Sequence, residues 1–333
     1  MKMISKVFSC VLAFSSLLGN AEGQNKYKIW YDKPASYWEE ALPVGNGRIA
    51  AMVFGDPQME QIQLNEETVS AGSPYQNYNE EAKAALPEIR RLIFEGKNEE
   101  AQIMAGTKIL SQVGNEMPYQ TIGRLNIRYQ DHQKVSSYYR DLDISNAVTV
   151  TRYKVDGVEF TEETFASFTD QLVIRHIKAS KPGTINCELF FNTPMRNPKR
   201  SIYGKKGLRL EGITHSSRYF PGKVHYCADL DVKNKGGEVI TANDTLLSVQ
   251  GASELTLYIS MATNFVNYKD ISGDPYQRNK TYLKNTEKEY DKAKAAHIAA
   301  YQNQFNRVTL DLGETSQINK PMDVRIKEFF FFL

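Results

Sequence analysis

The stretch AVTVTRYKVDGVEFTEETFAS, residues 147–167, indicates the fold class more clearly than any other part of the sequence. Apolar and polar residues alternate on both sides of Asp156 and Gly157, and alternation with period two is typical of half-buried β-strands. An Asp-Gly pair between two such runs is a strong hairpin signal, because both residues tolerate the backbone angles of a tight turn. The stretch therefore predicts two antiparallel strands joined by a short turn.

Similar runs follow at short intervals along the chain. They are QLVIRHIKAS (171–180), TINCELFF (184–191), GLRLEGI (207–213), KVHYCADLDV (223–232) and ELTLYISMA (254–262). Because no helical pattern lies between these runs, the sequence predicts a mainly β fold, a large antiparallel β super-sandwich, rather than βαβ units. The spacing is irregular and shows no internal repeat, which argues against a propeller or a solenoid. We assign residues 24–275 to this sandwich domain.

Two segments have helical patterns instead. Apolar residues recur at helical spacing in residues about 79–110, with Pro87 suited to a first turn, and we interpret this segment as an insertion between β segments. Residues 276–313 predict a helical linker that ends in a short strand, RVTLDLG (307–313). Residues 314–333 are polar at first and contain a proline, a composition typical of the start of a linker.

The N-terminal residues 1–23 are typical of an export signal. Two lysines precede an apolar run at residues 7–19, and the small residues Ala21 and Gly23 indicate cleavage before Gln24. The alternative is an uncleaved membrane anchor, but the run is too short to span a bilayer comfortably. We therefore expect an exported protein, periplasmic or extracellular, and no other segment is apolar enough to predict a membrane span.

Charge and cysteine content narrow the possible partners. The chain has 41 basic and 39 acidic residues, so it has no electrostatic footprint for nucleic acid or for an anionic membrane. Cys187 and Cys227 both lie in alternating, strand-like runs, which favours two small buried side chains. Export would permit a disulfide between them, so their pairing stays open.

Few motifs in the sequence indicate chemistry. The five histidines are scattered and form no metal-binding spacing, and no phosphate-binding loop or Gly-x-Ser-x-Gly elbow is present. The sequence therefore predicts neither a metal nor another cofactor.

The segment QLNEET, residues 63–68, offers paired carboxylates at the end of an apolar strand. Asn65, Glu66 and Glu67 are weak candidates for substrate binding, because such groups can bind sugar hydroxyls or perform acid–base catalysis. The alternative is a hydrogen-bonded turn between strand and loop, which these residue types also favour.

Several ordered motifs resemble those of glycoside hydrolase family 95, the α-L-fucosidase family. Residues 30–69, WYDKPASYWEEALPVGNGRIAAMVFGDPQMEQIQLNEETV, are similar to the opening of its members, and MPYQTIGRLNI (117–127) and YQNQFNRVTLDLG (301–313) resemble later segments. Ala50 replaces a usual glycine, and the tryptophan that normally follows the Asn-Glu-Glu-Thr motif is absent. The resemblance extends from about residue 27 to residue 329.

This resemblance implies an N-terminal super-sandwich, a helical linker, and fucosylated glycans, that is α-L-fucosides or α-L-galactosides, as substrates. In the family, an inverting mechanism depends on carboxylates and asparagines of a helical barrel that follows the linker. No position of this chain matches those motifs, so we assign no catalytic residue and expect the chain alone to be inactive.

Two further expectations concern the whole chain. The interpretation that competes with the hydrolase domain is a non-catalytic carbohydrate-binding or scaffolding module. Separately, a sandwich without its barrel would expose the face that normally docks on the barrel, and we expect the chain to self-associate through this face. The ending RIKEFFFFL (325–333) departs from the family pattern from Phe330 onward, and we interpret this tail as a frameshift product.

Overall fold

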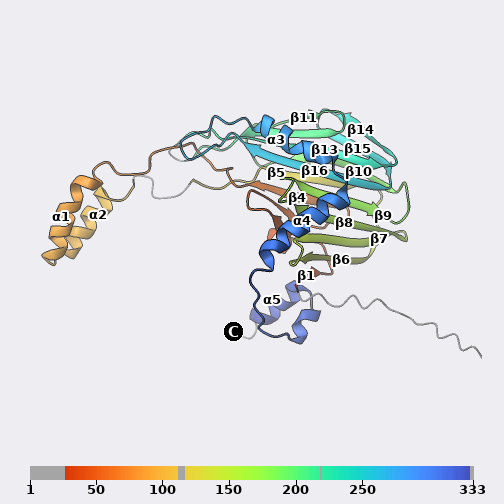
Figure 1. The fold of residues 1–333 in the computed structure, drawn as a ribbon, viewed down its shortest axis with the longest axis horizontal. Coiled ribbons are helices and arrows are strands. Elements are labelled where there is room, and N and C mark those ends of the chain that lie inside the picture. Colours follow the sequence, from red (N-terminus) through yellow and green to blue (C-terminus); the bar gives the residue numbers. More distant parts are fainter. Residues whose placement is uncertain (1–26, 112–116, 218–219, 331–333) are drawn as a thin grey trace, which may run out of the picture.

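Two antiparallel β-sheets packed face to face form the body of the molecule (Figure 1). The computed structural model describes residues 27–111, 117–217 and 220–330, so the export signal predicted at residues 1–23 and the last residues of the tail lie outside the described residues. The two sheets confirm the predicted mainly β sandwich. The boundary of this domain near residue 275 stays a prediction.

Sheet A has nine strands and sheet B has seven. In spatial order, sheet A contains β1 (Lys28–Tyr31), β6 (Val135–Asp143), β7 (Val148–Val155), β8 (Val158–Ala166), β9 (Val173–Ala179), β16 (Glu254–Thr263), β13 (His225–Lys235), β12 (Gly207–Ile213) and β11 (Lys199–Tyr203). Sheet B contains β14 (Glu238–Asn243), β15 (Leu246–Ala252), β10 (Ile185–Asn192), β5 (Gly123–Tyr129), β4 (Met59–Glu66), β3 (Ile49–Val53) and β2 (Leu42–Gly45).

The hairpin predicted from residues 147–167 is β7 and β8. Val155 pairs with Val158, and the two residues between them, Asp156 and Gly157, have φ angles of 48° and 81°. Asp-Gly is therefore the turn sequence that this connection requires, because larger or β-branched residues rarely adopt positive φ.

The core lies between the inner faces of the two sheets. Alternating side chains of facing strands fill it, for example Leu189 of β10 and Leu230 of β13, which are both fully buried. Cys187 belongs to this core. Cys227 is not part of it, and its backbone carbonyl accepts a hydrogen bond from Asn279, which lies in a helix on the outside of sheet A. Both thiols are free and buried, so the disulfide left open by the sequence is not formed.

A buried network of charged groups crosses this core. Arg175 of β9 donates to Glu162 of the neighbouring β8 and, across the sandwich, to Glu60 of β4 at 2.8 Å. Tyr129 and Tyr153 donate their hydroxyls to Glu162 at 2.5 Å and 2.7 Å. Burial raises the pKa of Glu60 to about 7, although Arg175 opposes the shift. One guanidinium thus holds two carboxylates from opposite sheets.

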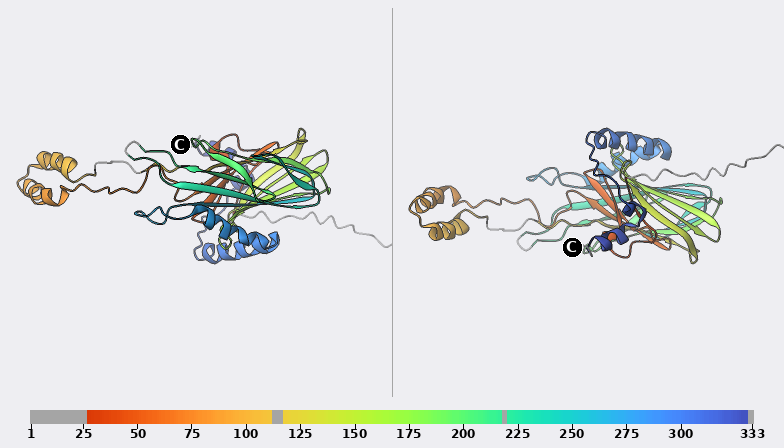
Figure 2. Two further views of the ribbon diagram at one scale, coloured as in Figure 1. Left: turned by 90° about the horizontal axis from the view of Figure 1, so that it is seen from above. Right: turned by 90° about the horizontal axis from the view of Figure 1, so that it is seen from below.

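Helices cover the outer face of sheet A. Figure 2 shows α3 (Pro275–Leu283) and α4 (Tyr290–Phe305) on one side of the sandwich, and the short 3₁₀ helix η2 (Lys284–Glu287) joins them. His297 of α4 packs against the ring of Phe165, and its Nε2 lies 3.2 Å from the carbonyl of Asn146. The helical character predicted for this part of residues 276–313 is confirmed.

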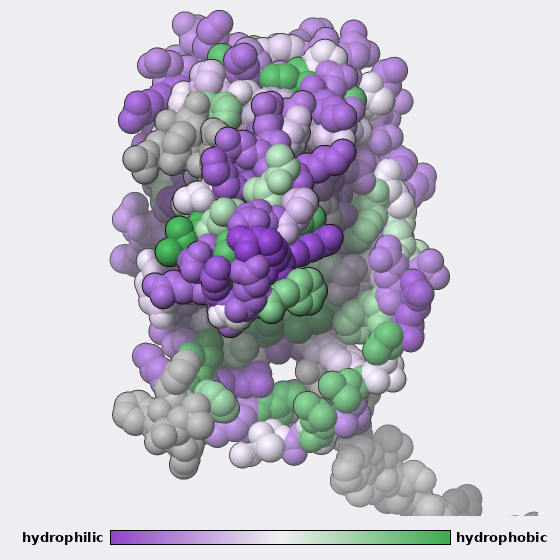
Figure 3. Space-filling view, turned by 90° about the vertical axis from the view of Figure 1, so that its left-hand side faces the viewer, coloured by the Kyte–Doolittle hydropathy of each residue, from purple (hydrophilic) through white to green (hydrophobic). Residues whose placement is uncertain are grey.

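The insertion predicted at residues about 79–110 is a helical hairpin. It consists of α1 (Ala82–Phe94) and α2 (Asn98–Lys108), and it projects away from the sandwich (Figures 1 and 2). Pro87 lies inside α1 rather than in its first turn, because the helix begins five residues earlier. Viewed from the end that carries the hairpin, hydrophobic side chains are mixed with hydrophilic ones on the surface (Figure 3).

The last part of the chain differs from its prediction. Residues 307–313 form no strand, and Val308, Leu310 and Leu312 are 82%, 74% and 86% exposed. The alternation is present, but no neighbouring strand in the described chain pairs with it. A strand without such a partner leaves its backbone groups unpaired.

Beyond this point, the segment with linker composition contains two more helices. These are the 3₁₀ helix η3 (Ser316–Asn319) and α5 (Met322–Phe330), and one further 3₁₀ helix, η1 (Trp38–Glu40), lies near the start of the chain. Asp323 of α5 forms a 2.6 Å ion pair with Lys33, and the Trp30 indole donates to the carbonyl of Ile318 at 3.3 Å. These contacts place α5 beside β1.

Candidate functional site

The strand-end residues proposed from the sequence lie at the end of β4. Glu66 points inward and is buried, and its carboxylate accepts from the backbone and the hydroxyl of Thr68 at 2.8 Å and 2.6 Å. Burial raises the pKa of Glu66. Asn65 and Glu67 alternate with it along the chain and are more exposed. The contacts of Glu66 are those of the strand-to-loop turn, and substrate binding by the three residues stays a prediction.

The neighbouring Gly-Asn-Gly-Arg motif joins the two sheets. Asn46 donates to the carbonyl of Ser167 at 2.9 Å, and Arg48 donates to the carbonyl of Met261 at 2.7 Å. The guanidinium of Arg48 also lies 3.7 Å from Glu66 and 4.6 Å from the centre of the Tyr282 ring. This motif therefore stabilises one end of the sandwich.

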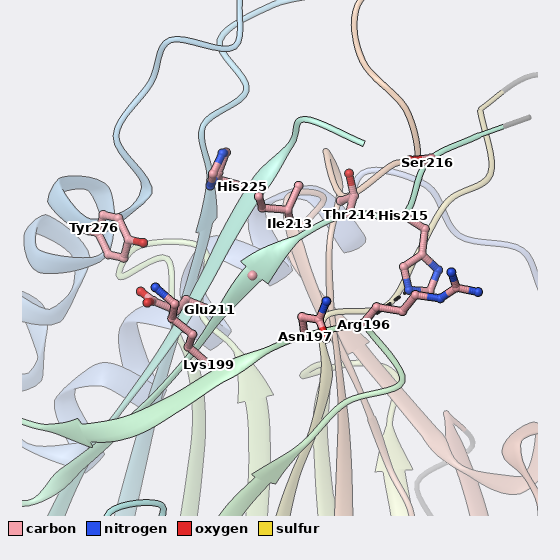
Figure 4. A pocket seen from close by; sticks show the side chains of 11 residues that line it. Arg196, Asn197, Lys199, Glu211, Ile213, Thr214, His215, Ser216, His225 and Tyr276 are labelled. Carbon is pink, nitrogen blue, oxygen red and sulfur yellow. Dashed lines mark hydrogen bonds between the residues drawn. The ribbon is translucent and has the colours of Figure 1, made fainter. Parts of the chain in front are cut away.

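A cavity of about 600 Å³ lies elsewhere, beside α3 at the end of the edge strands of sheet A (Figure 4). Three chain segments line it: residues 196–199 before and at the start of β11, residues 211–216 at the end of β12, and His225 of β13. Tyr276 in the first turn of α3 completes the wall. Its volume lies within the range of small-ligand pockets in proteins, about 300–1,000 Å³.

Strand register brings the polar residues of this pocket together. Glu211 of β12 is paired with Lys199 of β11, and two residues further on Ile213 is paired with His225 of β13. Residues directly opposite each other in adjacent strands point to the same face of a sheet. Lys199 and Glu211 therefore share one wall.

The loop after β12 is held by backbone contacts. The carbonyl of His215 accepts from Gly72 at 2.9 Å, and its N–H donates to Gln120 at 3.0 Å. Gly222 passes so close that a β-carbon there would lie 1.9 Å from the carbonyl oxygen of Thr214. Only glycine fits this approach, so the sequence itself positions the loop against the pocket.

Two side chains of the pocket have defined hydrogen-bonding states. Burial and a hydrogen bond to Glu211 raise the pKa of Tyr276 to about 12, so its hydroxyl is a donor at neutral pH. The Nε2 atom of His215 accepts the backbone N–H of Arg196 at 3.2 Å.

Tyr276 is also fixed from behind. The guanidinium of Arg209 lies 5.0 Å from the centre of its ring, and Arg209 in turn donates to both carboxylate oxygens of Asp229 at 2.6 Å and 2.8 Å. A bidentate pair of this kind holds the guanidinium plane in one orientation. The Asp229 pair therefore orients the guanidinium that lies behind the Tyr276 ring.

Sequence reasoning missed this pocket. Its residues come from three segments separated by turns, and each segment resembles an ordinary strand with a polar outer face. His215 and His225 have no metal-binding spacing in the sequence, and only the pairing of β12 with β13 brings His225 beside Ile213. The sequence offered one signal for the pocket, the two polar segments RNPKR (196–200) and THSS (214–217). No known motif links two such segments at this separation.

The described residues give no sign of a metal centre or of a membrane-crossing helix. Across residues 27–111, 117–217 and 220–330, no group of three or more His, Cys, Asp or Glu side chains could hold a metal ion. No helix in the same ranges has the length and apolar character needed to span a bilayer.

Comparison with known proteins identifies the class. The profile of the family described as "Glycosyl hydrolase family 65, N-terminal domain" matches residues 29–268. Since this match covers most of the chain, the protein belongs to that family of N-terminal glycoside hydrolase domains.

Curated relatives include enzymes named as fucosidases. The chain is 30% identical over 329 residues to α-L-fucosidase 2 of Arabidopsis thaliana, a match that covers 90% of this chain and 38% of the relative. It is 26% identical over 313 residues to "Probable alpha-fucosidase A" of Aspergillus niger, a match that covers 85% of this chain and 38% of the relative. The chain thus spans less than half the length of these relatives.

A solved structure supports the fold independently. A protein described as a kojibiose phosphorylase from the human microbiome superposes with a TM-score of 0.50 at 7% identity, over 85% of this chain and 38% of that one. At this identity the likeness concerns the fold alone.

Proposed function

We propose that this chain is the N-terminal super-sandwich domain of an exported, family 95-type glycoside hydrolase that acts on α-L-fucosides or α-L-galactosides in glycans. The observation that carries the proposal is the match to α-L-fucosidase 2 over 90% of this chain, which includes the Leu-Pro-Val-Gly-Asn-Gly-Arg and Leu-Asn-Glu-Glu-Thr motifs. The same match covers only 38% of the relative, so the proposed activity belongs to a longer enzyme.

The chain itself is proposed to be inactive, for a geometric reason. Glycoside hydrolysis requires two carboxyl groups about 5–9.5 Å apart across the substrate. Among the described residues, the pocket beside α3 contains a single carboxylate, Glu211, and Glu66 is engaged in a turn. Neither place offers an acid and a base on opposite sides of a sugar.

Hydrolysis of an aryl α-L-fucoside tests this proposal. We expect the purified 333-residue chain to release the aryl group no faster than a buffer blank. Saturable turnover that is lost in Glu66→Gln or Glu67→Gln would contradict it and would make the strand-end carboxylates catalytic. Glu238→Gln, at the exposed start of β14, is the matched control for surface charge.

Export is proposed from the N-terminal sequence alone. When the chain is expressed with its own first 23 residues, we expect the periplasmic or secreted product to begin at Gln24. N-terminal sequencing checks this, and a product that retains residue 1 in the membrane fraction would contradict it.

A non-catalytic carbohydrate-binding module is the second candidate, and the pocket beside α3 is the observation that favours it. Titration with a fucosylated oligosaccharide separates the candidates. Saturable binding without turnover would mean that the chain recognises a glycan by itself, as a binding module does and as a domain of a longer enzyme can. The absence of both binding and turnover would exclude the binding module and leave a domain that functions only within a longer enzyme.

A further inference from the structure

We propose that the pocket beside α3 binds one neutral, hydroxyl-rich pyranose unit, with Tyr276 as the aromatic wall and Glu211, Asn197 and His225 as hydrogen-bonding partners. The choice of a sugar rests on the proposed function, since the ligand is taken to be part of a glycan. The position of the site rests on the structure alone.

The pocket has the shape and rigidity that a small ligand requires. Its volume of about 600 Å³ is large enough for a monosaccharide with a bound water shell, and its walls come from β11, β12, β13 and α3. The guanidinium of Arg209 lies behind the Tyr276 ring, 5.0 Å from its centre. A preformed site loses less conformational entropy on binding.

The polar groups of the pocket suit hydroxyl groups, which both donate and accept hydrogen bonds. Glu211 supplies acceptor oxygens, Asn197 supplies both a donor and an acceptor, and the ring of His225 has no hydrogen bond to any described residue. Figure 4 shows these side chains arranged around the same space. Such a mixed set matches a ring with several hydroxyls better than an apolar ligand.

The charged groups that line the pocket are of both signs. Glu211 supplies one carboxylate, and Arg196 and Lys199 supply two positive charges. The first turn of α3 offers no open anion site, because Asp274 already accepts from the N–H groups of Tyr276 and Gln277 at 2.9 Å and 3.1 Å. The titration below therefore includes an anionic sugar as a competitor.

Calorimetric titration of the full 333-residue chain with methyl α-L-fucoside, methyl β-D-galactoside, methyl α-D-glucoside and glucuronate tests the proposal. We expect saturable binding of at least one neutral glycoside. Tyr276→Ala and Glu211→Gln should each weaken it about tenfold, because each removes one favourable contact of about 1–1.5 kcal/mol. Tyr268→Ala and Glu238→Gln, at exposed positions outside the pocket, should leave it unchanged.

The outcomes separate the site from the proposed function. If a neutral glycoside binds but neither Tyr276→Ala nor Glu211→Gln weakens the binding, the proposed position of the site is wrong. This result would leave the proposed function untouched. The proposal would also be overturned if the folded chain bound none of the neutral glycosides. Tighter binding of glucuronate than of the neutral glycosides would overturn it as well. Binding of galactoside or glucoside but not fucoside would support the site, and it would not bear on the fucoside substrate proposed for the longer enzyme. If Tyr276→Ala fails to fold, Asn197→Ala replaces it as the test variant. We expect Asn197→Ala to weaken binding as well.

Discussion

At the scale of single residues, the most constrained group is Arg175 with its two glutamates. All three side chains are essentially excluded from solvent, and they link β9, β8 and β4 across the core. Removing one member of a buried ion network leaves an uncompensated charge, which is far more costly than losing an exposed pair.

Arg175→Met should therefore destabilise the fold strongly. We expect a loss of about 3–5 kcal/mol in the free energy of unfolding, because Glu60 and Glu162 would remain buried without their cation. Urea unfolding measures the change. Arg128→Met is the matched control, since Arg128 pairs with Glu188 at the exposed surface of sheet B and should cost less than about 1 kcal/mol. Equal losses in the two variants would contradict the assigned role.

The raised pKa of Glu60 predicts a pH dependence of stability. The pKa of Glu60 in the folded chain, about 7, lies above the ordinary glutamate value of 4.5, so the folded chain binds the proton more tightly than the unfolded chain. Stability is therefore fully present below pH 4.5 and decreases as the pH rises to about 7, by at most about 3 kcal/mol. The groups facing Glu60 are Arg175, Glu162 and the backbone N–H groups of Phe54 and Gly55.

Glu60→Gln removes this titration. Urea unfolding at pH 5, 6, 7 and 8 should show the wild-type chain losing stability relative to the variant between pH 5 and pH 7, with no further divergence above pH 8. Parallel curves for the two proteins would contradict the assigned pKa.

At the scale of elements, the α1–α2 hairpin is separate from the sandwich. It has a small core of its own, made by Ile89, Leu92 and Ala101, and it exposes Phe94 by 88%. In Figures 1 and 2 the two helices lie apart from both sheets. Elements with few contacts to the main core open independently of it.

Leu92→Ala should consequently melt the hairpin without affecting the sandwich. We expect a lower helical signal in circular dichroism but an unchanged midpoint for the main unfolding transition. Leu64→Ala is the control in the core, because Leu64 of β4 is fully buried and its truncation should cost about 2–5 kcal/mol. A shift of the main transition by Leu92→Ala would show that the hairpin supports the sandwich.

Local sequence patterns predicted most elements but not how they come together. The Asp156-Gly157 turn and the alternating runs indicated the strands, since side-chain period and turn chemistry are local properties. The strand expected at residues 307–313 is absent because pairing depends on a neighbour, which the pattern does not specify. The pocket was not predictable either, because the pairing of β12 with β13 brings Glu211 and His225 together and the packing of α3 adds Tyr276.

At the scale of the whole molecule, exposed apolar side chains lie along the C-terminal part. Val308, Leu310 and Leu312 follow α4, and Phe329 lies in α5. Such exposed residues promote association, which is the basis for proposing that the chain self-associates.

Leu310→Lys combined with Leu312→Lys should reduce self-association. We expect the unmodified chain to elute above the monomer size in size-exclusion chromatography and to bind a hydrophobic dye, and the double variant to do both less. Ile240→Lys, on the edge strand β14, is the control. A clean wild-type monomer that binds no dye would contradict the proposal.

The most direct test of the account is a single proton NMR experiment on the 333-residue chain mixed with a fucosylated oligosaccharide. We predict saturation transfer from the protein to the sugar, abolished or reduced in Tyr276→Ala, with no free fucose signal over the course of the experiment. Steady release of free fucose by the wild-type chain would contradict the central claim that this domain recognises a glycan but does not hydrolyse it.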